Sequence, residues 1–285
     1  MALPLGGCSL TSSFLDPYGP VAALQRTLFF HVIGWMMIVL VPVFVLVPLF
    51  AWRYRRGNTA AVYRPDWQFS WPLEILVWGV PIVVVTVLSA LAIAKELRLD
   101  PYAPLQSSRP PLEIQVVGLD WKWLFIYPAQ GIATVGVAAV PSDRAVRFRL
   151  TSDTVMQSFF IPSLGSQLYA MAGMVTDLNL RADRIGRLRG LNTQFNGAGF
   201  QEQGFTLAAM RPPDFDVWVQ SVRAAGKLLD DAAYRRLSQQ STLTQARAAL
   251  GSDAMPPDAL YFAGVPPNLF DAIVGKYRHM AGTGH

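Results

Sequence analysis

Two long runs without a charged residue constrain the fold of this chain more than any other feature. The first extends from Leu28 to Trp52, and at about 1.5 Å per residue its 25 residues would form a helix roughly 37 Å long. The second extends from Ile75 to Ala94. Each run is long enough to cross the hydrocarbon core of a bilayer. Pro42 and Pro48 do not argue against a helix, because proline is tolerated in membrane helices. We therefore predict two transmembrane helices within residues 28–95.

The segment that connects the two runs, residues 53–72, predicts their orientation. It carries four arginines and one acidic residue, namely Arg53, Arg55, Arg56, Arg64 and Asp66. Short basic loops stay on the cytoplasmic side of a membrane. We therefore expect a cytoplasmic loop and place both chain termini on the opposite, periplasmic side.

The overall composition agrees with a chain that is partly in lipid. Hydrophobic residues make up 52% of the 285 residues and charged residues only 15%, which is more apolar than an ordinary soluble domain. The length leaves room for one globular domain beside the membrane segment. The net charge of +5 is scattered along the chain, whereas nucleic-acid binding needs clustered basic residues. We expect no nucleic-acid partner.

The only cysteine, Cys8, lies close to the start of the sequence. Leu5-Gly6-Gly7-Cys8 is similar to the lipobox at which bacterial lipoproteins are acylated, so residues 1–27 are predicted to be a lipoprotein-like N-terminus and lead-in, with a lipid on Cys8. The alternative is an incidental apolar N-terminus. Only seven residues precede Cys8 and none is basic, which is too short for an export signal, so we expect the natural start to lie further upstream.

Residues 111–211 change to an alternating pattern that is typical of half-buried strands. Apolar and polar residues alternate in the segments 112–116, 146–150 and 177–181. Turn signals separate such segments at Pro141-Ser142-Asp143, Pro162-Ser163-Leu164-Gly165 and Asn196-Gly197. Short strands with frequent turns indicate an all-β sandwich or barrel.

Residues 212–285 are predicted to form a helical C-terminal extension. Pro212-Pro213-Asp214 is a helix-start signal, and apolar residues follow it at helical spacing. A second apolar stripe runs from Leu269 to Tyr277. The proline-rich segment 253–267 is predicted to link the two helices.

Three motifs give the sequence a resemblance to a known family. They are Asp120-Trp121-Lys122-Trp123, Ser158-Phe159-Phe160-Ile161-Pro162 and Tyr169-Ala170-Met171-Ala172-Gly173-Met174. Together with the order of elements, they resemble subunit II of bacterial bo-type ubiquinol oxidases, in the haem-copper respiratory oxidase superfamily. The resemblance implies a cupredoxin-like sandwich carried by a helical hairpin in the bacterial inner membrane. It also implies a proton-pumping complex in which subunit I binds the haems and copper, with smaller subunits III and IV as further partners.

Cytochrome c oxidases of this superfamily hold a dinuclear copper centre in the same domain. Their ligands are an upstream His followed by Cys-x-Glu-x-Cys-x-x-x-His-x-x-Met. Here Gln157 stands in the place of the upstream His, and the loop from Phe195 to Phe205 contains neither Cys nor His. The histidines His31, His279 and His285 lie outside the domain, and its remaining soft side chains, Met156, Met171, Met174 and Met210, are interpreted as core filling. The resemblance therefore implies no metal and no cofactor in this chain, and ubiquinol rather than cytochrome c as the electron donor.

Four residues are weighed for individual roles. Glu74, at the cytoplasmic start of the second span, resembles the family's acid at a proton-uptake entrance; the alternative is a solvated acid favoured by the helix dipole. Trp121 and Trp123 are predicted to be core and interface aromatics. His31 lies at the outer edge of the first span, where it can reach lipid headgroups or water. No catalytic residue is expected in this chain.

Three other readings of the sequence differ in function. The complex could oxidise menaquinol instead of ubiquinol. The chain could be a free-standing membrane lipoprotein with a ligand-binding β-sandwich, although two spans and a lipid would then be redundant. A copper-bearing electron-transfer subunit conflicts with the missing ligands.

Overall fold

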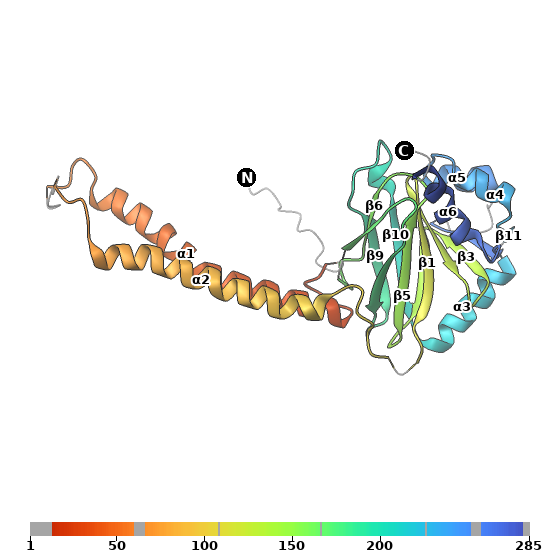
Figure 1. Ribbon diagram of the computed structural model, residues 1–285, viewed down its shortest axis with the longest axis horizontal. Helices are drawn as coiled ribbons and strands as arrows, with labels where there is room; N and C mark the ends of the chain where they lie inside the picture. The colour runs from red at the N-terminus through yellow and green to blue at the C-terminus, as the bar shows by residue number, and fades with distance from the viewer. Residues whose placement is uncertain are drawn as a thin grey trace, which may run out of the picture. The chain divides into compact units, whose positions relative to one another are not determined.

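The computed structural model describes residues 13–59, 66–107, 109–165, 167–225, 227–251 and 258–281. Cys8, Arg64 and His285, and the side chain of His279, lie outside what it describes. The chain divides into two compact units. One is helical and comprises residues 26–100, and the other comprises residues 101–285 together with the lead-in before residue 26 (Figure 1).

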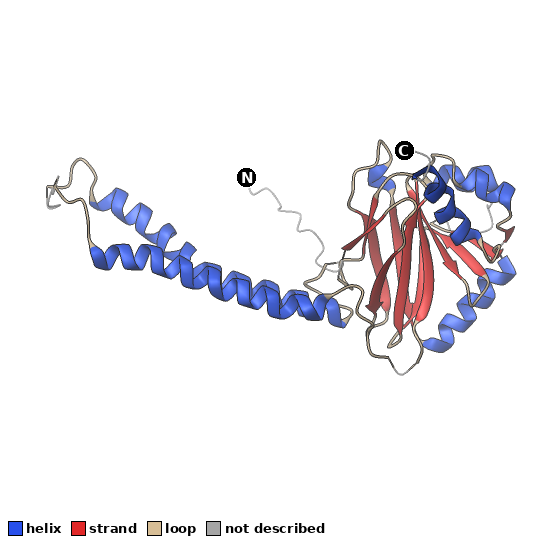
Figure 2. Ribbon diagram, viewed as in Figure 1, coloured by secondary structure: helices blue, strands red, loops and turns tan. Residues whose placement is uncertain are grey.

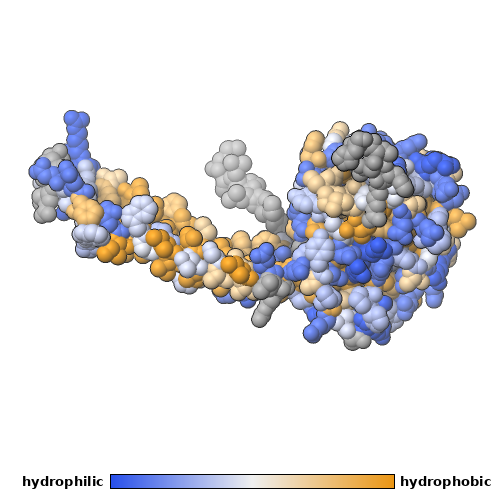
Figure 3. Space-filling view, viewed as in Figure 1, coloured by the Kyte–Doolittle hydropathy of each residue, from blue (hydrophilic) through white to orange (hydrophobic). Residues whose placement is uncertain are grey.

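The helical unit is a hairpin of two long helices, α1 (Pro20–Arg53) and α2 (Trp71–Leu99). Both are long and apolar enough to cross a membrane, and their surfaces are largely hydrophobic (Figure 3). They cover both predicted spans. Pro42 and Pro48 lie inside α1 and Pro81 inside α2. The helix α2 begins after Ser70, whose extended backbone forms the N-cap.

The lead-in and the first turn of α1 belong to the second unit. Val21 and Ala22 are buried there. The backbone N–H of Tyr18 donates to Ser163 O at 2.8 Å, and that of Ala22 donates to Leu164 O at 3.1 Å. The turn before residue 166 therefore holds the segment that leads into the first membrane helix.

The second unit is a sandwich of two sheets (Figure 2). Sheet A has the strand order β11-β12-β3-β2-β1-β5-β8, and sheet B has the order β4-β10-β9-β6-β7. The pairs β1–β5 and β10–β4 are parallel. The strands are β1 (Leu112–Leu119), β2 (Lys122–Tyr127), β3 (Ile132–Val135), β4 (Val137–Pro141), β5 (Ala145–Ser152), β6 (Gln157–Phe160), β7 (Gln167–Ala170), β8 (Thr176–Arg181), β9 (Gly186–Asn192), β10 (Gly204–Met210), β11 (Lys227–Leu228) and β12 (Leu260–Gly264).

The core between the sheets is aromatic. Trp123 of β2 packs edge-on against Phe159 of β6, with ring centroids 5.2 Å apart. Phe159 in turn stacks on Phe205 of β10 at 5.0 Å. These three rings come from both sheets and are buried. Stacked and edge-on aromatic pairs stabilise a fold beyond the area that they bury.

The other face of β2 and its neighbours in sheet A is covered by the C-terminal residues. Leu124 and Ile126 alternate with the inward aromatics of β2 and pack against α4 (Asp231–Leu237), α5 (Leu243–Leu250) and α6 (Leu269–Ala281). Figure 2 shows these helices lying against one side of the strands. All six residues of β2 are therefore buried, as expected for a strand with neighbours on both faces.

The C-terminal extension differs from the prediction in two respects. It is not only helical, because β11 and β12 continue sheet A at its edge beside β3. The segment 253–267, predicted as a linker, contains β12, which pairs antiparallel with β3. The predicted helix after Arg211 is α3 (Pro212–Ala225), whose Phe215 and Trp218 rings pack on Tyr127. Residues 212–281 thus complete the sandwich.

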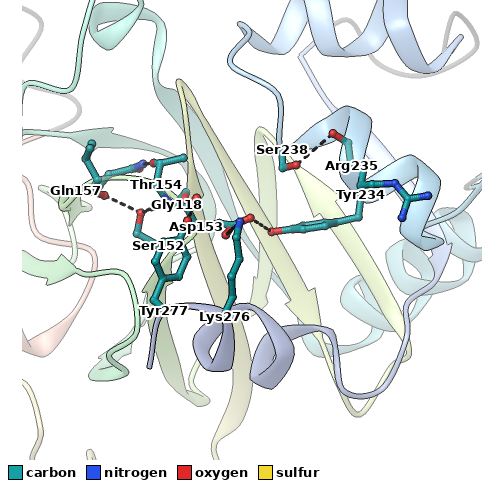
Figure 4. Close-up of polar contacts among 11 residues, drawn as sticks. Gly118, Ser152, Asp153, Thr154, Gln157, Tyr234, Arg235, Ser238, Lys276 and Tyr277 are labelled. Carbon is teal, nitrogen blue, oxygen red and sulfur yellow. Dashed lines mark hydrogen bonds and ion pairs between the residues drawn. The ribbon is translucent and has the colours of Figure 1, made fainter. Parts of the chain in front are cut away.

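One buried acid joins this C-terminal segment to the sandwich (Figure 4). Asp153 follows β5, and its side chain is 3% exposed. Tyr234 of α4 donates its hydroxyl to Asp153 Oδ2 at 2.7 Å, and Lys276 of α6 donates to Oδ1 at 2.8 Å. The Tyr277 hydroxyl donates to the backbone oxygen of Asp153 at 2.6 Å. Burial, together with the neighbouring carboxylate, raises the pKa of Tyr234, while the hydrogen bond to Asp153 raises the pKa of Lys276.

Removing this acid should loosen the C-terminal helices. Asp153→Ala leaves the buried Tyr234 hydroxyl and the Lys276 ammonium without their acceptor, so we expect the free energy of unfolding to fall by about 2 kcal/mol. The measurement is urea unfolding of the detergent-purified chain, followed by tryptophan fluorescence. Asp214→Ala is the control, because its ion pair with Arg211 is exposed on both sides and should cost less than about 1 kcal/mol. Equal losses in the two variants would contradict the anchoring role of Asp153.

Candidate functional site

Gln157, which the family resemblance places where other members have a copper-binding histidine, is the first residue of β6 and is fully buried. Its Nε2 donates to Leu119 O at 3.2 Å and to Thr154 Oγ1 at 3.0 Å. Gly118 of β1 lies directly beneath it, and a Cβ at this position would come within 2.5 Å of Gln157 Oε1. The glycine therefore makes room for the amide at the end of β1.

Gln203, from the loop that carries the other copper ligands in the family pattern, meets Gln157. Its Nε2 donates to Leu119 O at 3.2 Å and also to Gln157 Oε1. Its Oε1 accepts from Asn192 Nδ2 at 3.0 Å and from Asn196 Nδ2 at 2.7 Å. We call Gln157, Asn192, Asn196 and Gln203 the amide cluster. It joins β1, β6, the end of β9 and the loop between β9 and β10.

The donor set of the amide cluster does not suit a copper centre of the thiolate-bridged kind. Such a centre needs thiolates and imidazoles, whereas the cluster offers neutral amides that already hydrogen-bond one another. Within the described ranges, no group of three or more His, Cys, Asp or Glu side chains could hold a metal ion. The side chains at this place therefore hold protein segments together.

Trp121 and Trp123 have different surroundings although they are two residues apart. Trp123 is fully buried in the core between the sheets. Trp121 occupies the two-residue turn between β1 and β2 with a φ of 67°, a left-handed conformation that is strained for a bulky residue. Its ring lies against Gly199, where a Cβ would overlap it, and its Nε1 donates to Asn196 O at 3.4 Å. The Trp121 ring thus packs against the β9–β10 loop, which the amide cluster also contacts.

Lys122, between the two tryptophans, is buried, and none of its hydrogen-bond partners among the described residues is a carboxylate. Its Nζ donates to the backbone oxygens of Asp120, Gln239 and Ser241 at 2.8–3.1 Å. Burial lowers the pKa of Lys122 to about 8, and the nearby Asp120 charge opposes this effect. The ammonium group therefore ties the start of β2 to the segment between α4 and α5.

Sequence reasoning was wrong for two of the methionines and missed several polar residues. Met156 and Met174 were interpreted as core filling but are 41% and 52% exposed, because both lie in turns beside short strands. Asn192 and Asp153 were not identified. A signal existed for Asp153, since it is the only charged residue between Arg149 and Asp177.

Glu74 and His31 lie in the helical unit. Glu74 is in the first turn of α2 and accepts a hydrogen bond from Trp78 Nε1 at 3.0 Å. His31 lies on α1 and is exposed. The amide cluster contains neither residue, as both belong to the other unit.

Comparisons with known proteins decide the family. No protein-family model matches the chain. The chain is 44% identical over 278 residues to cytochrome bo(3) ubiquinol oxidase subunit 2 of Pseudomonas putida, covering 98% of this chain and 84% of the relative. The chain belongs to the cytochrome bo(3) ubiquinol oxidase subunit 2 family. A member of this family is a subunit of an oxidase complex, and the two long apolar helices agree with a membrane protein.

Other relatives of this subunit 2 family carry related names. Ubiquinol oxidase subunit 2 of Acetobacter aceti is 41% identical, covering 98% of this chain and 86% of the relative. Quinol oxidase subunit 2 of Bacillus subtilis is 37% identical, covering 82% of this chain and 73% of the relative. Among solved structures, the periplasmic domain of subunit II of cytochrome oxidase of Bradyrhizobium japonicum matches 41% of this chain and 96% of its own length, with 19% identity and a TM-score of 0.39.

The amide cluster should be required for the order of the β9–β10 loop. Gln203→Leu takes a donor from Gln157 Oε1 and an acceptor from Asn192 Nδ2 and Asn196 Nδ2, so we expect a loss of about 2 kcal/mol in the free energy of unfolding. Hydrogen exchange in residues 193–203 should also accelerate. The matched control is Gln201→Leu in the same loop, because Gln201 is exposed. Unchanged exchange in Gln203→Leu would show that the cluster does not order the loop.

Proposed function

We propose that this chain is the second subunit of a proton-pumping quinol:oxygen oxidoreductase of an aerobic respiratory chain. The observation that carries the proposal is the amide cluster, which fills the place of a copper relay with side chains that hold protein segments. A soluble cytochrome c would need such a relay to deliver electrons through this domain. Quinol reaches the complex within the bilayer and needs none. Family membership at 44% identity supports the same conclusion.

The role proposed for the chain itself is structural. It packs on a partner subunit I that binds the haems and copper, with smaller subunits III and IV in the same complex, and it binds no cofactor of its own. The complex lies in the bacterial inner membrane with the sandwich and both termini in the periplasm, since α1 ends at Arg53 and the loop that follows contains Arg55 and Arg56. A lipid on Cys8 would add a second anchor on that side.

Two alternatives are menaquinol as the substrate and a free-standing membrane lipoprotein. Menaquinol as substrate stays open at the level of this subunit, and a relative in Bacillus subtilis is named simply a quinol oxidase subunit. A free-standing lipoprotein would have two spanning-length helices in addition to its lipid, and as anchors these would be redundant.

The donor of the complex can be measured directly. The purified assembly should consume oxygen with ubiquinol and not with reduced cytochrome c, because the sandwich lacks the ligands for a copper relay. An optical spectrum of the same preparation should show haem that copurifies with a tag on this chain. Oxygen uptake on cytochrome c at a rate comparable to that on quinol would contradict the proposal. Menaquinol, tested in parallel, separates the two quinol classes.

Glu74 is proposed to take part in proton uptake at the cytoplasmic boundary. Glu74→Ala should leave the complex assembled but slow its turnover several-fold in proteoliposomes, because a titratable carboxylate at a membrane boundary can relay protons. Glu74→Gln should have the same effect while keeping an acceptor for Trp78. Glu96→Gln, near the other end of α2, is the control. Wild-type turnover in both Glu74 variants would contradict the proton-uptake role and would favour a solvated acid at the start of a helix.

A further inference from the structure

A polar cavity of about 180 Å³ opens where three segments of the sandwich unit meet. They are the segment before β1, the turn between β4 and β5, and the start of α3. We call it the β4–β5 cavity. Figure 1 shows the start of α3 beside the chain that leads into β1. The cavity shares no residue with the amide cluster, and its volume suits a small polar ligand rather than a haem or a quinone.

Four charged side chains line the β4–β5 cavity, two of each sign. Arg109 and Arg144 are basic, and Asp143 and Asp216 are acidic. Within the residues that the structure describes, none of the four takes part in an ion pair. The cavity therefore presents two guanidinium groups and two carboxylates that are available to a ligand.

Other charged groups close to the cavity are already paired. Arg181 of β8 lies opposite Ala145, directly after the β4–β5 turn, and its guanidinium group binds Asp183 at 2.6 Å. Arg211, just before α3, binds Asp214 at 2.7 Å. These two ion pairs lie beside the cavity and leave the charge of its lining balanced.

The basic and acidic groups come from different walls of the cavity. Arg144 Nε donates to Pro110 O at 2.8 Å, which brings its guanidinium group to the segment that carries Arg109. Asp216 belongs to the wall formed by α3. Ser142 also lines the cavity and is only 7% exposed, and its hydroxyl has no hydrogen-bond partner among the described residues. A basic wall, a buried hydroxyl and an acidic wall thus surround one small space.

We infer that the β4–β5 cavity binds a phosphoethanolamine group, which is a zwitterion with a phosphate and an ammonium group. Guanidinium groups bind phosphate oxygens through paired hydrogen bonds, and the Ser142 hydroxyl is a further donor. The carboxylates of Asp143 and Asp216 accept hydrogen bonds from the ammonium group. An anion alone would face two unpaired carboxylates, and a cation alone would face two unpaired guanidinium groups. A zwitterion satisfies both.

The balance of charge favours the phosphodiester form of this group, which is the head group of a phospholipid. A diester phosphate and an ammonium group sum to zero, as the four side chains do, whereas a phosphate monoester carries about −1.5 to −2 at pH 7. Arg109 also follows Leu99, the last residue of α2, by ten residues. The basic wall therefore belongs to the segment that leaves a helix of membrane-spanning length. The inference goes beyond the proposed function and stands without it.

The test is calorimetric titration of the full-length chain, purified in a maltoside detergent, with glycerophosphoethanolamine as the probe. We expect saturable binding to the wild-type chain. Inorganic phosphate and ethanolamine, each titrated alone, should bind at least about tenfold more weakly, a change that corresponds to about 1.4 kcal/mol. No binding of glycerophosphoethanolamine would overturn the site. Equally tight binding of phosphate alone or of ethanolamine alone would overturn the assignment to a zwitterion.

Variants of the lining test each half of the ligand. Arg109→Gln and Asp216→Asn remove one charge of each sign at exposed positions, so both should fold, and each should weaken binding at least about tenfold. Arg189→Gln and Asp271→Asn are the matched controls, because both residues are exposed and lie outside the lining. Urea unfolding reports folding, and Ser142→Ala replaces a variant that fails to fold. Wild-type affinity in the cavity variants, or an equal loss in the controls, would overturn the inference.

Free phosphoethanolamine, a monoester, distinguishes a lipid head group from a soluble ligand. Weaker binding of the monoester than of the diester supports the head group, and phosphatidylethanolamine should then copurify with the wild-type chain in a larger amount than with Arg109→Gln. Tighter binding of the monoester would overturn the assignment to a lipid.

Discussion

Burial of β2, the middle strand of sheet A, on both faces is the constraint on which the rest of the sandwich depends. Its inner face contacts the aromatic residues of sheet B, and its outer face is covered by α4, α5 and α6. A strand in this position has no side for polar residues, which explains why Lys122–Tyr127 is buried throughout. Even Lys122 is enclosed, and its ammonium group is satisfied by backbone oxygens of the segment between α4 and α5. Without the C-terminal segment, the apolar outer face would be in water.

The amide cluster follows from the same burial. Leu119 ends β1 with its backbone oxygen inside the protein, and both Gln157 and Gln203 donate to it. A buried carbonyl without a donor would cost free energy comparable to a lost hydrogen bond. Apolar residues in place of the missing copper ligands would leave this oxygen and Asn192 unsatisfied. Glutamine fills the volume and supplies the donors, so a polar network stands at the place that the family resemblance assigns to a metal.

The sequence predicted the elements whose pattern is local and missed those defined by distant contacts. The two membrane helices and the alternating strands β1, β5 and β8 could be predicted because each run carries its own period. The strands β11 and β12 are short, and β12 is recognisable only through its pairing with β3. Gln157 was identified through a missing ligand, but its network could not be predicted, because Asn192 and Gln203 join it only in the folded chain. The interpretation of Met156 and Met174 as core residues was wrong because it rested on their apolar thioether side chains, and this chemistry does not tell whether a side chain is buried.

The C-terminal segment and the amide cluster are coupled through one short turn. Asp153 is held by Tyr234 and Lys276 from α4 and α6, while Thr154, the next residue, accepts a hydrogen bond from Gln157 of the amide cluster. The turn is thus fixed from both sides before it reaches Val155 and Met156. A segment that looks like an appendage in the sequence therefore fixes the turn that leads into β6 and the amide cluster.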